Sequence, residues 1–169
     1  MKADPYWIPG PWHGRLAIIA RPRGGDWLED EMAAWRRSGI NLVVSLLEED
    51  EAAQLGLVDE RQAAEGQEIG FASFPIPDRG VPSSAEKAIG LIGVIAAVLK
   101  AGKNVAVHCR QGIGRSGLIA AGVLMSSGLR AEEALETVSS ARGLSVPETL
   151  EQRRWIEELP SCVPVASQV

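Results

Sequence analysis

The sequence contains few cysteines, few aromatic residues and less positive than negative charge. Its 169 residues include two cysteines, and aromatic side chains make up 5% of the chain. Two cysteines do not form the disulfide framework of a small secreted protein, so we expect a reducing compartment and a cytoplasmic protein. With 17 Lys and Arg against 22 Asp and Glu, the formal net charge is −5. This balance argues against a general nucleic-acid binder.

Long apolar runs are also lacking. No uninterrupted apolar stretch reaches the roughly 18 residues that a membrane span requires, and residues 1–7 lack the apolar segment of a signal peptide. We therefore expect no membrane partner. No cluster of His, Cys and carboxylate residues has the spacing of a zinc site. We accordingly expect neither a metal nor a cofactor.

The remaining composition is that of one folded domain. Hydrophobic residues make up 46% of the chain, which is enough for a core and argues against disorder. We expect a single domain over residues 1–169, acting as a monomer, with an irregular segment at 1–14 and a flexible tail at 160–169. The run of acidic residues at 48–51 is interpreted as the first turn of a helix, and the helical stretch that follows, to about residue 67, is expected to be exposed.

One glycine-rich stretch at residues 108–117, HCRQGIGRSG, joins a predicted buried strand to a predicted buried helix. Such a loop directs backbone N–H groups and the positive end of the helix dipole at one point, which makes it an anion site. The same field favours a thiolate on Cys109, the nucleophilic form of cysteine. The planar guanidinium of Arg115 matches two oxygens of a phosphate, and the Ser116 hydroxyl is placed to donate to the Cys109 sulfur.

The loop backbone is expected to bind the same anion. Gly112 and Gly114 are predicted to adopt positive φ, so that successive N–H groups converge. The residues that we expect to bind the substrate are Arg110, Gln111, Gly112, Ile113, Gly114 and Arg115.

Two other interpretations apply to the same residues. The stretch 112–117 also spells G-x-G-x-x-G, the dinucleotide-binding fingerprint. That motif requires a second strand ending in an acidic residue about 20 positions on, whereas residues 130–138 have the apolar spacing of a helix. The second alternative is a purely structural loop with a buried, inert Cys109.

The stretch from His108 to Ser116 resembles the H-C-x5-R-[ST] signature of the cysteine-dependent protein tyrosine phosphatases, in particular their small atypical dual-specificity branch. Together with the alternating strands and helices, the resemblance implies an α/β fold in three layers. A central, mostly parallel sheet of about four to five strands would be flanked by helices. The resemblance also implies a phosphocysteine intermediate, an oxyanion-binding arginine and an aspartate general acid. His108 is expected to orient the loop through hydrogen bonds to backbone carbonyls.

Asp78 is the candidate for that acid. It lies in a proline-rich loop after a predicted strand at 71–76, and such loops meet the Cys109 loop at one edge of a parallel sheet. Its spacing from Cys109 resembles that of the acid loop in the family. The alternative role for Asp78 is that of a turn former.

The expected reaction is hydrolysis of phosphate monoesters, with phosphotyrosine and also phosphoserine or phosphothreonine in a protein or peptide as substrate. One alternative is the same mechanism on a lipid, an RNA 5′-phosphate or a small molecule. Another is a non-catalytic phosphate-binding module, against which the presence of Cys109, Arg115 and Asp78 argues. Gln152 is interpreted as structural, and the sequence leaves open whether Cys162 forms a disulfide with Cys109.

Overall fold

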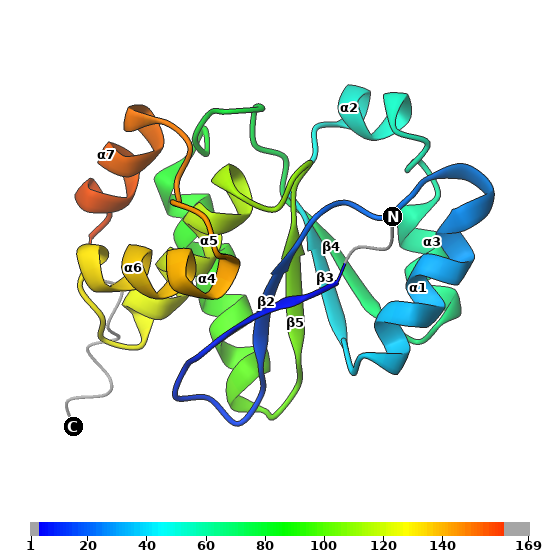
Figure 1. Cartoon of the computed structure of the whole chain (residues 1–169), viewed down its shortest axis with the longest axis horizontal. Helices are drawn as coiled ribbons and strands as arrows, with labels where there is room; N and C mark the ends of the chain where they lie inside the picture. Colours follow the sequence, from blue (N-terminus) through cyan, green and yellow to red (C-terminus); the bar gives the residue numbers. More distant parts are fainter. Residues whose placement is uncertain (1–3, 161–169) are drawn as a thin grey trace.

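The computed structural model describes residues 4–160, which form three layers around a five-stranded sheet (Figure 1). The strand order is β1-β2-β5-β3-β4. β1 runs antiparallel to β2, and the other pairs are parallel, which confirms the predicted mostly parallel sheet. The strands are β1 Tyr6–Ile8, β2 Leu16–Ile19, β3 Leu42–Ser45, β4 Gly70–Ser73 and β5 Val105–His108.

Helices cover both faces of the sheet. α4, α5, α6 and α7 lie on one side, and α1 and α3 lie on the other (Figure 1). Among residues 4–160, no helix is long and apolar enough to cross a membrane. The helices are α1 Leu28–Arg37, α2 Glu49–Gln54, α3 Glu60–Gly66, α4 Ala85–Lys100, α5 Gly114–Ser126, α6 Ala131–Arg142 and α7 Leu150–Glu158, with a 3₁₀ turn, η1, at Gly25–Trp27.

The central strand β5 is buried on both of its faces, as its apolar sequence predicts. Val105 and Val107 belong to the core cluster on the side of α4 and α5, whereas Ala106 belongs to the cluster formed with α1 and α3. This alternation follows from the two-residue period of a strand. β5 is therefore fixed from both sides, and the loop that follows it begins from a rigid position.

Several boundaries differ from the predictions. The segment 1–14 was expected to be irregular, but it contains β1, which pairs with β2. The stretch 48–67 is two short helices, because Gly56 adopts φ +71° and breaks the chain between them. It is also not uniformly exposed, since Glu51 and Glu60 are buried. The predicted tail lies outside the described residues except for its first residue, and Cys162 lies there too.

The segment before α7 packs closely on α5 because α5 carries a glycine at the contact. A Cβ atom on Gly117 would lie 2.1 Å from Cγ1 of Val146. α7 itself begins with a capping box, in which the Thr149 hydroxyl accepts from the backbone N–H of Gln152. The close approach brings residues 146–152 beside the start of α5.

Candidate active site

The loop that links β5 to α5 holds the cysteine at the carboxyl edge of the sheet. Cys109 is buried, and its Sγ lies 3.3 Å from the Ser116 hydroxyl. Gly112 has φ +68°, as predicted, and a Cβ there would lie 2.7 Å from the carbonyl carbon of Ile19. Both the conformation and the space therefore require glycine at this position.

Gly114 differs from the prediction because it is absent from the residues of 4–160 that adopt positive φ. Its lack of a side chain provides space instead. A Cβ there would lie 2.9 Å from Oε1 of Gln152 and 3.2 Å from Oε1 of Glu148. The first residue of α5 is therefore small because the side chains of Glu148 and Gln152, which follow α6 in the chain, approach its backbone.

Arg115 connects the loop to two other segments. The side chain is 2% exposed, and its two terminal nitrogens each donate to Glu51 at 2.8 Å. The guanidinium also donates to the backbone carbonyl of Ile76 at 3.0 Å and to Oδ1 of Asp78 at 3.1 Å. Its planar set of donors thus orders α2 and the loop after β4 around one cation.

The charges at this contact shift both pKa values. The hydrogen bond from Arg115 is the main reason that the pKa of Glu51 lies below its ordinary value, although burial opposes it. Burial lowers the pKa of Arg115, but the hydrogen bond to Glu51 and the charges of Cys109, Glu51 and Asp78 outweigh that effect and raise it. Arg115 therefore stays fully charged.

His108, the last residue of β5, contacts the loop through its ring. Its ring Nδ1 lies 3.2 Å from the backbone oxygen of Cys109, and its Nε2 lies 2.5 Å from Oε1 of Glu60 on α3. The contact to a backbone carbonyl agrees with the expected role in orienting the loop. The buried carboxylate of Glu60 fixes the ring from its other side.

Asp78 lies at the rim of the site, in the loop after β4. Its side chain is 56% exposed, while one oxygen contacts Arg115. The structure thus brings together the four predicted catalytic residues, Cys109, Arg115, Asp78 and Ser116. Asp78 is exposed enough to contact a bound substrate and remains close to the cysteine loop.

A small cavity of about 150 Å³ opens over the cysteine. Of the predicted substrate-binding residues, Arg110, Gln111 and Arg115 line it. Ile113 instead packs against the hydrophobic core, and the carbonyl of Gly112 accepts from Nε of Arg142 at 2.9 Å. The cavity is lined by Asp78, Arg79, Cys109, Arg110, Gln111, Arg115, Glu148 and Gln152.

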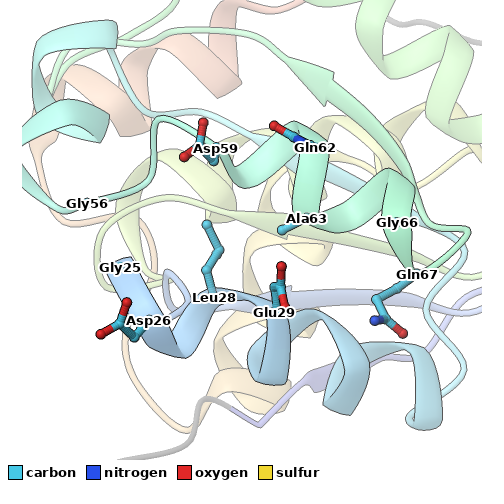
Figure 2. A pocket seen from close by; sticks show the side chains of 10 residues that line it. All are labelled: Gly25, Asp26, Leu28, Glu29, Gly56, Asp59, Gln62, Ala63, Gly66 and Gln67. Carbon is cyan, nitrogen blue, oxygen red and sulfur yellow. The ribbon is translucent and has the colours of Figure 1, made fainter.

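A larger hollow, of about 800 Å³, lies between α1 and α3 and shares no residue with this cavity (Figure 2). Its polar side chains are acidic or amide groups, without a nucleophile or a cation. It therefore has the larger volume but not the chemistry of a phosphate site. The polar residues around it are Asp26, Glu29, Asp59, Gln62 and Gln67.

Four supporting residues were not predicted from the sequence: Glu51, Glu60, Arg142 and Glu148. Glu51 had a usable signal, since it follows β3 and the carboxyl ends of parallel strands gather at one edge. The other three lie on remote segments with no motif of their own. Over residues 4–160, no group of three or more His, Cys, Asp or Glu residues could hold a metal ion.

The lowered pKa of Glu51 predicts a pH-dependent contribution to stability. Glu51→Gln should lower the free energy of unfolding at neutral pH by about 3 kcal/mol, because Arg115 loses its buried charged partner. Because the pKa of Glu51 is lowered in the folded state, its charge stabilises the protein at pH values above 4.5, the ordinary pKa of a glutamate. This stabilisation is lost as the pH falls below 4.5. The difference between the two proteins should therefore shrink in acid.

Chemical denaturation from neutral pH to below pH 4.5 measures the difference in the free energy of unfolding between the native chain and Glu51→Gln. Glu49→Gln, at an exposed residue of the same helix, is the control. A difference that stays constant below pH 4.5 would show that the charge of Glu51 is not what stabilises the site.

The comparisons with known proteins agree with this geometry. Residues 18–129 match the family model described as "Polymorphic toxin system, DSP-PTPase phosphatase". The solved structure of Tk-PTP in its active form has a TM-score of 0.76 and 31% identity, covering 92% of this chain and 95% of that one. Kinase associated phosphatase has a TM-score of 0.84 and 18% identity, covering 94% of both chains, which shows the shared fold.

Two curated relatives match over shorter regions. The Arabidopsis thaliana phosphatidylinositol 3,4,5-trisphosphate 3-phosphatase and protein-tyrosine-phosphatase PTEN1 is 38% identical over 90 residues, which cover 50% of this chain and 21% of that protein. The Rattus norvegicus cyclin-dependent kinase inhibitor 3 is 30% identical over 86 residues, which cover 50% of this chain and 40% of that protein. The chain thus spans less than half the length of either relative. Since the family model covers more than half of the chain, the protein belongs to the dual-specificity phosphatase family of the cysteine-dependent tyrosine phosphatase superfamily.

Proposed function

We propose that the chain hydrolyses phosphate monoesters through a phosphocysteine intermediate on Cys109. One observation carries the proposal: the buried thiol and the Arg115 guanidinium line one small cavity, and Asp78 lies at its rim. A phosphate in this cavity would meet a nucleophile, a cation and a proton donor together. The match to the phosphatase family supports the same conclusion.

The first step forms a bond between the cysteine sulfur and phosphorus. The Cys109 thiolate attacks the phosphorus in line with the ester oxygen, and the bond between phosphorus and that oxygen breaks. Arg115 and the loop N–H groups bind the phosphoryl oxygens and stabilise their charge. Asp78, protonated on approach, gives its proton to the leaving oxygen.

The second step reverses these roles. Asp78, now a carboxylate, takes a proton from a water molecule, whose oxygen attacks the phosphorus. The bond between phosphorus and sulfur breaks, and inorganic phosphate leaves. Ser116, at 3.3 Å from Sγ, donates a hydrogen bond to the thiolate as it forms and so stabilises the leaving sulfur. The loop and the arginine meet the phosphate charge, so the mechanism uses no metal or cofactor.

We propose phosphotyrosine, together with phosphoserine and phosphothreonine, in proteins or peptides as the substrate. The cavity is small, and the Asp78 side chain at its rim is 56% exposed, which suits phosphorylated side chains of different length. Among proteins of the same fold, PTPMT1 has been solved with PI(5)P, so a phosphorylated lipid is the alternative that a substrate panel must include. We further propose a single catalytic domain over residues 1–169 that acts as a cytoplasmic monomer.

Hydrolysis of p-nitrophenyl phosphate without added metal tests the reaction. The native chain should turn over this substrate, and Cys109→Ser should abolish turnover because a serine hydroxyl is not ionised near neutral pH. Release of p-nitrophenol is followed by its absorbance. Equal turnover by the two proteins would exclude Cys109 as the nucleophile, and no turnover by either would move the interpretation to a phosphate-binding module.

Asp78→Asn tests the general acid. The variant should lower kcat by about 10²-fold and should affect an alkyl phosphate more than p-nitrophenyl phosphate, because the poorer leaving group depends more on the proton. The alkaline limb of the pH profile should flatten as well. Asp59→Asn, which changes an exposed aspartate outside the cavity, is the control. Full activity of Asp78→Asn on the alkyl phosphate would remove Asp78 from the mechanism.

A further inference from the structure

Glu148 lies in the segment between α6 and α7 and reaches into the cavity above Cys109. One of its carboxylate oxygens accepts the backbone N–H of Gly114 at 3.2 Å. The other accepts from a terminal nitrogen of Arg79 at 3.2 Å. The side chain is 25% exposed, so this is a partly buried carboxylate between the phosphate loop and the loop that carries Asp78.

The surrounding contacts hold Glu148 in this place. Its backbone N–H donates to Oε1 of the buried Gln152 at 3.1 Å, and the Gln152 amide donates to the carbonyl of Gly80 at 3.0 Å. Gly114 has no side chain, and a Cβ there would lie 3.2 Å from Oε1 of Glu148. The backbone of Glu148 is therefore held by the buried Gln152, and its carboxylate lies against the backbone of Gly114.

A backbone N–H carries one proton for donation. The Gly114 N–H is one of the groups expected to bind the phosphoryl oxygens, and Glu148 already accepts it. A carboxylate and a phosphate dianion that compete for one donor must also approach each other closely, and their negative charges repel. The phosphoryl group can bind the N–H of Gly114 only when the carboxylate has left it.

We propose that Glu148 sets the affinity of the loop for phosphate: its carboxylate competes with phosphate dianions for the Gly114 N–H and so weakens their binding. The proposal rests on the proposed function only in that the loop binds phosphate. When phosphate enters, the carboxylate keeps its contact with Arg79 and gives up its contact with Gly114. The same competition raises the KM for phosphate esters and favours release of inorganic phosphate after the second step.

Binding of inorganic phosphate tests this inference without catalysis. The measurement is isothermal titration calorimetry on the full chain carrying Cys109→Ser, alone and combined with Glu148→Gln or Glu148→Ala. Glu148→Ala should bind phosphate about tenfold more tightly, as expected when one charge-assisted competitor is removed. Glu148→Gln, which keeps a neutral acceptor but loses the charge, should also bind phosphate more tightly, by a smaller factor. Glu151→Gln, which removes the same charge from an exposed residue at the start of α7, should leave the Kd unchanged.

Tighter binding is informative because a variant that merely damaged the loop would bind phosphate more weakly. Thermal melts show which variants are folded, and Glu148→Gln keeps the shape of the side chain if the alanine variant does not fold. An equal or weaker affinity in the folded Glu148 variants would overturn the inference while leaving phosphate binding in place. Absence of binding in every protein would overturn both proposals, whereas tighter binding without turnover in the native chain would overturn only the proposed catalysis.

Discussion

The ion pair between Arg115 and Glu51 is the contact on which the geometry of the site depends. Two hydrogen bonds of 2.8 Å join the first turn of α5 to α2. Because the pair is buried, removing one of the two charges leaves the other without a partner inside the protein, which is strongly destabilising. The same guanidinium contacts the carbonyl of Ile76 and the carboxylate of Asp78. The loop that carries Cys109 and the loop that carries Asp78 therefore keep their relative positions through one cation.

Charge balance explains how an acidic protein holds an anion site. The cavity over Cys109 combines three arginines with the carboxylates of Asp78 and Glu148, and Glu51 lies behind Arg115. In the free protein the carboxylates partly neutralise the cations. We propose that a phosphate binds by exchange with these carboxylates, so that its affinity reflects the difference between its own binding energy and theirs. Under this proposal, the affinity for phosphate depends on carboxylates that lie outside the signature.

The sequence predicted the parts of the site that depend on local patterns. The apolar strand, the glycine-rich loop and the buried helix are contiguous, so residues 104–125 were interpretable without knowledge of the rest of the chain. Asp78 could be placed because it follows a strand of the same parallel sheet. Glu60 and Glu148 could not be placed, since they contact His108 and Gly114 only through the tertiary packing of short, polar segments. β1 was missed because three residues give no periodic pattern.

In the proposed reaction the phosphoryl group passes through the sulfur of Cys109. Rapid quenching in an alkaline denaturant during turnover of an aryl phosphate, followed by peptide mass spectrometry, detects this intermediate. We expect one phosphoryl group on the peptide that contains Cys109 at early times, and none on that peptide after turnover ends. Turnover at the same rate with no phosphoryl group on that cysteine at any time would contradict it.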